Sequence, residues 1–578
     1  ENALPVSNTE VISALQTDCR VRNMKIKGSN IILECLKEQG ADTVFGYPGG
    51  QIMPLYDALY DYSDDIHHVL TSHEQGATHA ADGYARSTGK VGVAFATSGP
   101  GATNTVTGIA TAFMDSVPMV VITGQVPLAL IGRDSFQEVD IYGITLPITK
   151  HNFFVNDISE LADDIREAFR IAKSGRPGPV LVDVPKDIMG QLYEYEALPA
   201  AEKDAVVKKY LDEDLDRLAE LINRAERPLI YAGGGVITAE ASVQLTELAE
   251  KADIPVVSTL MNLGAISRKH PLSLGMVGMH GQKEANQAVH NSDLLITIGA
   301  RFSDRVTGDV NHFAKNAVIA QIDIDESEID KNVVVDLSLI GDMREILSRL
   351  LEKTEKKKNP VWLEKIDSFR VPKAISEDAF VPQNIFKVIH EVLGDDVIVA
   401  TDVGQHQMWT AQEWPFTKPR TNITSGGLGT MGFGLGAAIG AQMGNPNARV
   451  IHISGDGSFR MNCNEMATVA ANKLPIITIL FKNNVLGMVR QWQKLFFEKR
   501  YSSTTLPDVI DYVKLAEAFG LGGYRTDTLK GLKAALEKAV DSGKGNLIVC
   551  DIDTGEDVFP IVPPGNAMND QVLSAEDL

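Results

Sequence analysis

The sequence predicts an α/β protein with three open, mostly parallel-sheet domains. The chain has 578 residues, and at about 100–200 residues per domain this length gives three or more cores. Short valine-rich runs bounded by Gly, Pro or Ser alternate with helical patterns, which is typical of parallel strands buried on both faces. Two charged stretches, at 193–209 and 350–362, separate these runs into three blocks and are expected to be linkers.

Each block contains its own set of expected strands. These are 91–98, 118–124 and 179–185 in the first block; 228–235, 254–260, 293–300 and 317–325 in the second; and 396–404, 448–458, 474–484 and 545–553 in the third. We therefore expect domains at 26–192, 193–360 and 361–555, with a polar leader at 1–25 and a C-terminal tail at 556–578. The leader lacks the basic start and apolar core of a signal peptide, so no signal peptide is expected. A processed or trimmed form of the chain is a separate expectation for this polar segment.

Composition excludes several classes of function. The chain has 54 Lys and Arg against 76 Asp and Glu, and its formal net charge of −22 disfavours nucleic acid and anionic membranes as partners. No apolar run reaches about 18 residues, so no transmembrane helix is expected. Four scattered cysteines without C-x-x-C spacing predict neither a disulfide framework nor a zinc site, and they fit a reducing compartment.

Ligands of open parallel sheets bind at the carboxyl ends of the strands, so the turns after the strands are the candidate sites. "SGPGATN" (98–104) and "GGGV" (233–236) are glycine-rich turns that lead into helices and could approach a phosphate. Each is a weak signal, and a plain tight turn is the commoner explanation. "GGGV" is also the only support for a nicotinamide dehydrogenase, because the full G-x-G-x-x-G is missing.

The third block carries a more specific pattern. Asp456 in "SGDGSF" and Asn483 in "LFKNN" follow two expected strands that are neighbours along the chain. A carboxylate and an amide oxygen at one sheet edge suit magnesium, which completes its shell with water and substrate phosphates. The backbone at Gly455 and Gly457 can approach a diphosphate. An Asp-Gly turn beside an Asn-rich strand end is the plain alternative, and the occurrence of both elements in this order argues against it.

One glutamate stands among small, uncharged residues in "TSHEQGATHAADGYAR" (71–86). Thr71-x-x-Glu74 and Ser72-x-x-Gln75 both fit a capping box, which predicts a helix start. The H-E-x-x-H pattern of zinc proteases fails, because residue 77 is alanine. Glu74 is therefore either a helix cap or a functional carboxylate in an apolar pocket.

G-D-G followed by N-N resembles the signature of thiamine-diphosphate enzymes, and nearly the whole chain is similar to the catalytic subunits of the acetohydroxyacid synthase (acetolactate synthase) family. The segments that carry this resemblance are "FGYPGG" (45–50), "HEQGATHAADGYAR" (73–86), "TSGPGATN" (97–104), "DSFQE" (134–138), "ITKHNF" (148–153), "SGRPGPVLVDVPKD" (174–187), "RFSDRVTG" (301–308), "VGQHQMW" (403–409), "GDGSF" (455–459) and "LGMVRQWQ" (486–493).

The resemblance implies an architecture and an assembly. The three blocks would be a pyrimidine-binding domain, a central FAD-binding domain and a diphosphate-binding domain, with the tail near the active site. The cofactors would be thiamine diphosphate, Mg²⁺ and a structural FAD. The active site would lie between two chains of a homodimer or homotetramer, with a possible small regulatory subunit. The location would be cytoplasmic, or the plastid or mitochondrial matrix if the leader is a trimmed transit segment.

The resemblance also implies the reaction. Pyruvate would be decarboxylated, and the two-carbon unit would be joined to pyruvate or 2-ketobutyrate, giving 2-acetolactate or 2-aceto-2-hydroxybutyrate for valine, leucine and isoleucine synthesis. Glu74 would share a proton with the aminopyrimidine ring, which its uncharged neighbours favour. Residues expected to line the reaction site are Gly50, Phe136, Gln137 and Lys186. Trp492, with Phe136 and Lys186, would recognise the second substrate.

Cofactor residues are carried over position by position. Thiamine diphosphate would contact Glu74, Gly404, Gln405, His406, Met431, Gly455, Gly457, Ser458, Asn483, Gly487 and Met488, with Met431 as the prop of the folded cofactor. The metal ligands would be Asp456, Asn483 and the carbonyl of Val485. The family's second asparagine would select Asn484 instead, and Lys482 replaces the first asparagine of the usual pair.

FAD would contact residues from all parts of the second block and one from the first: Arg176, Gly234, Thr259, Leu260, His280, Gly281, Arg301, Asp304, Arg305, Asp323, Ile324 and Asp342. "RFSDRVTG" resembles the FAD-contacting segment of the anabolic enzymes, and a solvated ion-pair cluster is its plain alternative. Leu128 and Ala129 replace residues that are often basic or polar near the substrate tunnel of the family.

Three alternatives remain at this level. A pyruvate oxidase would use the same cofactors with a working flavin, and Trp492 and "RFSDR" argue against it. Glyoxylate carboligase lacks the glutamate that Glu74 supplies. A non-catalytic protein on the same fold would not need Glu74, Asp456 and Asn483 together.

Overall fold

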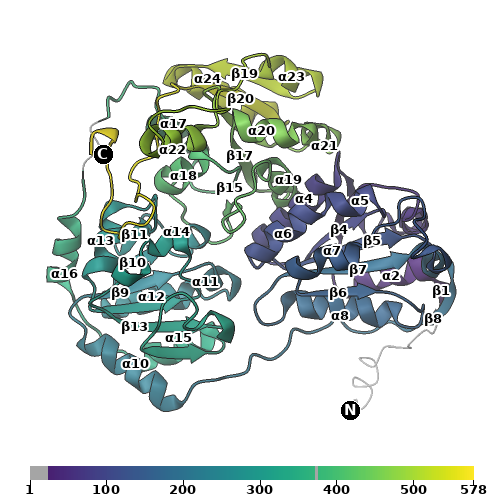
Figure 1. Ribbon diagram of the computed structural model, residues 1–578, viewed down its shortest axis with the longest axis horizontal. Coiled ribbons are helices and arrows are strands. Elements are labelled where there is room, and N and C mark those ends of the chain that lie inside the picture. The colour runs from purple at the N-terminus through teal and green to yellow at the C-terminus, as the bar shows by residue number, and fades with distance from the viewer. Residues whose placement is uncertain (1–23, 372–374, 578) are drawn as a thin grey trace, which may run out of the picture.

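The computed structural model describes residues 24–371 and 375–577, and these residues form three six-stranded parallel sheets and one two-stranded ribbon. The sheets belong to three separate bodies, coloured purple to blue, teal and green along the chain (Figure 1). The α/β class with three parallel-sheet domains is confirmed. Most of the predicted leader, residues 1–23, lies outside the described residues.

The first sheet has the order β3-β2-β4-β5-β7-β6. The predicted strands at 91–98, 118–124 and 179–185 are β4, β5 and β7, whereas β2, β3 and β6 were not predicted because they are short and partly polar. The bounds are β2 Thr43–Gly46, β3 His67–Leu70, β4 Gly92–Ala96, β5 Met119–Gln125, β6 His151–Phe154 and β7 Pro179–Pro185. Its helices are α2 Gly28–Glu38, α3 Met53–Leu59, α4 Glu74–Thr88, α5 Pro100–Asn104, α6 Val106–Met114, α7 Ile141–Thr145, α8 Leu161–Lys173 and α9 Lys186–Gly190.

The middle sheet has the order β11-β10-β9-β12-β13-β14, which is the strand order of dinucleotide-binding sheets. All four strands expected here are present. The bounds are β9 Pro228–Ala232, β10 Val256–Ser258, β11 Ser273–Met276, β12 Leu294–Ile298, β13 Val318–Asp323 and β14 Leu337–Ile340. The helices are α10 Asp212–Arg224, α11 Gly235–Thr238, α12 Ser242–Ala252, α13 Lys283–Asn291, α14 Asp304–Thr307, α15 Met343–Lys353 and α16 Pro360–Asp367.

The third sheet, β16-β15-β17-β18-β20-β19, repeats the order of the first when the strands are counted within each domain: second, first, third, fourth, sixth, fifth. The bounds are β15 Val397–Thr401, β16 Asn422–Ile423, β17 Arg449–Gly455, β18 Ile477–Lys482, β19 Gly522–Thr526 and β20 Asn546–Asp551. The helices are α17 Pro382–Leu393, α18 Gln405–Glu413, α19 Gly434–Gly444, α20 Asp456–Asn462, α21 Met466–Ala471, α22 Gly487–Phe496, α23 Tyr512–Ala518 and α24 Leu529–Ser542.

Both predicted linkers are partly wrong. The first begins inside β8 (Leu192–Tyr195), which pairs antiparallel with β1 (Met24–Lys27). The second overlaps the end of α15 and the start of α16. Trp362 on α16 is buried, and its indole donates to the carbonyl of Pro228 at 3.0 Å. Charge made this stretch resemble a linker, but its one tryptophan packs against the middle sheet.

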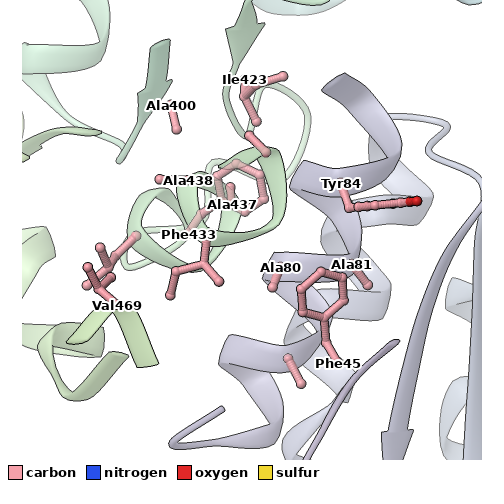
Figure 2. Packing of buried hydrophobic residues seen from close by; sticks show 14 of the residues in the cluster. Phe45, Ala80, Ala81, Tyr84, Ala400, Ile423, Phe433, Ala437, Ala438 and Val469 are labelled. Carbon is pink, nitrogen blue, oxygen red and sulfur yellow. The ribbon is translucent and has the colours of Figure 1, made fainter. Parts of the chain in front are cut away.

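The first and third domains meet through α4 and α19 (Figure 2). A methyl group at Gly83 would lie 2.1 Å from the carbonyl oxygen of Ala437, and one at Gly440 would lie 1.7 Å from that of Ala80. Glycine is therefore required for the close approach of the two backbones. One cluster of buried apolar side chains, including Phe45, Tyr84 and Phe433, continues from one domain into the other.

No helix in the described part of the chain has the length and apolar character needed to cross a membrane.

Candidate active site

Glu74 is the first residue of α4 and lies directly after the turn that follows β3. Its side chain is 8% exposed, and Oε2 accepts a hydrogen bond of 2.9 Å from Nδ2 of Asn104 on α5. Among the described residues, no Lys or Arg forms an ion pair with it. The site therefore holds a buried carboxylate with a neutral donor as its partner.

The predicted capping box is wrong. The N-cap of α4 is His73, whose Nδ1 accepts from the backbone N–H of Gln75 at 3.1 Å. The hydroxyl of Thr71 donates to backbone carbonyls, and that of Ser72 donates to the carbonyl of Asn464 in the third domain. The two hydroxyls are used elsewhere, so Glu74 is not part of a cap.

Glu465 of the third domain holds the turn before Glu74. Its buried carboxylate accepts from the backbone N–H of Ser72 at 3.1 and 3.2 Å and from the hydroxyl of Thr468 at 2.6 Å. Burial raises the pKa of Glu465. The sequence showed no signal for this residue, because a glutamate at the end of a helical segment is common on protein surfaces.

The predicted metal ligands lie together at the carboxyl edge of the third sheet. Asp456 is the first residue of α20, after β17, and its Oδ2 accepts from the backbone N–H of Asn484 at 3.0 Å. Asn483 follows β18, and its Oδ1 accepts from the backbone N–H of Val485 at 3.3 Å. Burial raises the pKa of Asp456.

Asn484 keeps its place as the alternative ligand. It has a left-handed backbone with φ of +57°, and its Oδ1 is buried without a hydrogen-bond partner among the described residues. The described residues contain no group of three or more His, Cys, Asp or Glu that could hold a metal ion. One carboxylate with amide and carbonyl oxygens nevertheless fits Mg²⁺, which keeps several waters and uses few protein ligands.

Three turns form the candidate diphosphate site. Gly404 precedes α18 with φ of +150°, a conformation that favours glycine. A methyl group at Gly455 would lie 2.8 Å from Nδ1 of His406, and one at Gly487 would lie 2.0 Å from Oε1 of Gln405. Burial lowers the pKa of His406 to about 4, and its Nε2 has no partner among the described residues. The turns therefore bring backbone amides close to a neutral imidazole whose Nε2 has no partner among the described residues.

Met431 lies beside the G-D-G turn. A methyl group at Gly457 would lie 2.7 Å from Cδ2 of Leu486 and 3.8 Å from Cε of Met431. The hydroxyl of Ser458 donates to the carbonyl of Val403 at 2.9 Å. Met488, on α22, is half-buried. The structure thus places an apolar group next to the candidate diphosphate site.

Family models of the thiamine pyrophosphate enzymes match all three domains: the N-terminal TPP-binding domain at 26–144, the central domain at 215–350 and the C-terminal TPP-binding domain at 402–551. A probable acetolactate synthase large subunit from Methanocaldococcus jannaschii is 46% identical over 565 residues, covering 95% of each chain. The large subunits of acetolactate synthase isozymes 1 and 2 from Escherichia coli are 45% and 46% identical, covering 95% of this chain and 98% and 99% of theirs.

The chain belongs to the thiamine pyrophosphate enzymes, among the acetolactate synthase large subunits. Glu74 and the pair Asp456 and Asn483 therefore both lie in domains that the family models describe as binding thiamine pyrophosphate. Both TPP-binding models cover the residues in question, Glu74 in one and Asp456 with Asn483 in the other.

The candidate substrate residues occupy strand ends and an exposed loop. Phe136 is 82% exposed, and Gln137 has a left-handed backbone with φ of +62° against Gly99. Glu138 accepts backbone N–H groups from Gly132 and Ser135, which fixes this loop. Lys186 is the first residue of α9, after β7, and a methyl group at Gly50 would meet open space.

Trp492 is half-buried on α22, so it is not a core tryptophan. Its ring lies against Phe496, with centroids 5.5 Å apart, and Cζ of Arg305 in the middle domain is 5.8 Å from the ring centroid. The structure therefore brings a candidate substrate residue and a candidate FAD residue together.

The candidate FAD residues lie mostly at the carboxyl edge of the middle sheet. Gly234, Thr259, Leu260, Arg301, Asp323, Ile324 and Asp342 all follow or end its strands. Burial raises the pKa of Asp323 to about 6. Asp342 caps α15, with Oδ1 accepting from the backbone N–H of Glu345 at 3.0 Å. Asp304 and Arg305 are exposed.

Two further candidates are already engaged. Arg176, from the first domain, pairs with Asp325 at 3.2 Å and Glu328 at 2.7 Å. His280 donates from Nδ1 to the carbonyl of Pro560 at 3.2 Å, next to Gly281, and burial lowers its pKa to about 4. The ion-pair alternative that the sequence left for "RFSDRVTG" corresponds to the exposed contact of 3.8 Å between Arg305 and Asp304.

Proposed function

We propose that this chain is the catalytic subunit of an acetolactate synthase, which joins a two-carbon unit from pyruvate to pyruvate or 2-ketobutyrate. The observation that carries the proposal is the presence of two sites in this chain. One is the buried carboxylate of Glu74, which has no cation partner among the described residues, and the other is an oxygen-rich turn at Asp456 and Asn483. The names of the relatives, acetolactate synthase large subunits, support the same reaction.

Thiamine diphosphate, when bound, supplies the electron sink for breaking and forming carbon–carbon bonds next to a carbonyl. Glu74 would share a proton with a ring nitrogen of the aminopyrimidine, and Asn104 would hold the carboxylate in place. Asp456, Asn483 and the carbonyl of Val485 would hold Mg²⁺ against the diphosphate. His406, Gln405 and the glycine turns would bind its oxygens through neutral donors.

We also propose a homodimer, with Glu74 of one chain facing the diphosphate site of another, and a homotetramer as the alternative. Among the described residues, the carboxylate of Glu74 hydrogen-bonds within its own domain. Phe136, at the proposed reaction site, is 82% exposed, so a second chain has a surface to cover. The term "large subunit" in the relatives' names supports a small regulatory subunit as a further partner. We also propose a cytoplasmic location, or the plastid or mitochondrial matrix if the leader is a trimmed transit segment.

FAD is proposed as a bound but redox-silent cofactor of the middle domain. The dinucleotide-type strand order and the polar residues at its carboxyl edge support it. The proposed reaction has no redox step, so the flavin would act through structure. Trp492 is proposed to favour the ethyl group of 2-ketobutyrate by apolar contact, a preference worth about 1–3 kcal/mol per methylene.

The test is a product assay on the purified chain with thiamine diphosphate, Mg²⁺ and FAD. With pyruvate alone we expect acetolactate, and with added 2-ketobutyrate mainly acetohydroxybutyrate. Hydrogen peroxide and acetyl phosphate without acetolactate would identify a pyruvate oxidase instead. No product with all three cofactors bound would favour a non-catalytic protein. The variant Trp492→Leu is expected to lower the ratio of acetohydroxybutyrate to acetolactate by about ten-fold while retaining acetolactate formation.

A further inference from the structure

A buried ionic triad lies where the first domain meets the third. Arg86, on α4, contacts both Asp82, one turn earlier, and Asp115, directly after α6. Its Nη2 is 2.9 Å from Oδ2 of Asp115 and 3.2 Å from Oδ2 of Asp82. The side chains of both aspartates are fully buried. Two carboxylates around one guanidinium leave a negative charge that needs further donors.

Asp115 finds those donors in the third domain. Its Oδ2 accepts from the backbone N–H of Gly426 at 2.9 Å, and its Oδ1 accepts from that of Gly427 at 2.7 Å. Nη1 of Arg86 donates to the carbonyl of Thr424 at 3.0 Å. The triad therefore binds three backbone groups, of Thr424, Gly426 and Gly427, at the start of the segment 424–433, which we call the Met431 loop.

The Met431 loop is packed against its neighbours on several sides. A methyl group at Gly427 would lie 2.9 Å from both Oδ1 of Asp115 and the carbonyl of Met114, and one at Gly426 would lie 2.3 Å from Sδ of Met261. Thr430, directly before Met431, shares a hydrogen bond of 2.7 Å with the hydroxyl of Thr111 on α6. The end of α6 and Arg86 thus determine where the loop lies.

The turn that carries Asp115 also contacts the middle domain. The carbonyl of Met114 accepts from Nη1 of Arg301, in the middle domain, at 2.8 Å. Within the first domain, the hydroxyl of Ser116 accepts from Nε of Arg176 at 2.7 Å. Both arginines are candidate FAD residues. Residues 114–116 therefore touch all three domains, with Asp115 directed to the Met431 loop.

We propose that Asp115 is a positioning residue that fixes the Met431 loop, and through it Met431, against the thiamine cofactor. This inference rests on the proposed function. Two backbone N–H groups bound by one carboxylate set both the distance and the orientation of the loop. Asp82 provides the comparison within the same triad, because its hydrogen bonds in the described part of the chain go only to Arg86.

The experiment compares Asp115→Asn with Asp82→Asn in the purified chain loaded with thiamine diphosphate and Mg²⁺. Each variant removes one buried carboxylate beside Arg86, so both are expected to lower the melting temperature. Only Asp115→Asn replaces an acceptor of the Gly426 and Gly427 amides. Two readouts follow: exchange of the thiazolium ring proton of the bound cofactor for deuterium, and hydrogen–deuterium exchange of the amides at 424–433.

In Asp115→Asn we expect proton exchange of the bound cofactor to slow by about 10–100-fold, because small displacements at a reacting centre have effects of this size. Loop amides lose protection in the same variant. In Asp82→Asn both readouts stay near the wild-type values. Equal cofactor exchange in the two variants would overturn the inference. A wild-type chain that binds no thiamine diphosphate would instead overturn the proposed function.

Gly427→Ala keeps the test decisive if Asp115→Asn does not fold. It retains every charge of the triad and places a methyl group 2.9 Å from the Asp115 carboxylate. The loop must shift, and we expect the same slowing of cofactor exchange. Wild-type exchange in a folded Gly427→Ala protein would contradict the positioning role.

Discussion

The first and third domains share one strand order but differ in what their turns carry. After the first strand of each sheet come Gly50 and Gly404; after the second, Glu74 and Met431; after the third, "SGPG" and "SGDG". One domain thus presents a carboxylate where the other presents a thioether, and a neutral glycine turn where the other presents Asp456. The shared strand order places these turns at the same edge of each sheet. Because their side chains differ in charge and polarity, we propose that the two sets of turns bind different ends of thiamine diphosphate.

The contact between these domains is reciprocal. Glu465 of the third domain binds a backbone amide two residues before Glu74, and Asp115 of the first domain binds two amides four and five residues before Met431. Each domain therefore fixes the turn that carries the other's proposed cofactor-binding residue, Glu74 or Met431. Carboxylates suit this task because each oxygen accepts more than one hydrogen bond.

The largest effect should come from Glu74→Gln, which keeps the shape of the side chain but cannot exchange a proton with the cofactor. We expect kcat to fall by about 10²–10⁴-fold, the range for losing a general acid–base group, with thiamine diphosphate still bound. Steady-state kinetics and a cofactor titration measure the two quantities. The exposed Glu160→Gln, at the start of α8, is the control. Near-normal turnover would show that Glu74 does not transfer a proton in the reaction. The difference between the carboxylate of Glu74 and the thioether of Met431 would then have no catalytic meaning.

Glu465→Ala tests the support of Glu74 from the opposite domain. The N–H of Ser72 would lose its acceptor, which costs about 1–3 kcal/mol in a buried site, and the turn before Glu74 would be free to move. We expect kcat to fall by about 10–100-fold. Thr468→Val removes a donor to the same carboxylate and the 3.5 Å contact with the Ser72 hydroxyl, but it leaves the hydrogen bond from the Ser72 N–H, so it should change melting temperature more than kcat. Equal loss of kcat in both variants would mean that the hydrogen bond from the Ser72 N–H to Glu465 has no separate effect on turnover.

Gly440→Ala tests the helix contact that joins the two domains. Its methyl group would meet the carbonyl oxygen of Ala80 at 1.7 Å, so α4 and α19 must separate. We expect a loss of about 3 kcal/mol or more in the free energy of unfolding, at the upper end of overpacking effects. Chemical denaturation measures it. Gly190→Ala, in α9 with open space around it, should be neutral or slightly stabilising. Similar stability in the two variants would show that the contact adapts.

The sequence predicted the sheets better than their edges. Valine-rich central strands can be predicted because burial on both faces requires apolar residues throughout. In contrast, β3, "HHVL", is half exposed and has no such continuous apolar pattern. Trp362 shows the limit of charge as a linker signal, since one buried indole outweighs its charged neighbours. Thr71 and Ser72 fit a capping box by spacing alone, but spacing does not reveal that their hydroxyls bond elsewhere.

Some residues of the candidate site could be predicted from the sequence, and others could not. Turns after adjacent strands predicted the proximity of Asp456 and Asn483, because parallel strands bring their carboxyl ends to one edge. Asp115 and Glu465 were not predicted. They act over more than 300 residues of sequence through backbone amides, and such contacts depend on how domains pack.

The smallest effect concerns the sixth strands of the two sheets. At matching register, Asp183 lies beside Thr123 in the first domain and Cys550 lies beside Phe481 in the third. Burial raises the pKa of Asp183 from its ordinary 3.8 to about 7. The folded protein therefore keeps a proton that the unfolded chain releases between these values, and the carboxyl's contribution to stability is lost as pH rises through this window.

Asp183→Asn removes this titration. We expect its melting temperature to fall less than that of the wild type between about pH 5 and pH 7.5, because at most one proton is involved. Cys550→Ala, which also changes a buried side chain but removes no group that titrates in this range, should lower the melting temperature equally at both values. If the Asn variant keeps the full pH slope, Asp183 is ionised in the folded protein, and Thr123 and Gln125, which donate to it at 2.6 and 2.9 Å, must outweigh its burial.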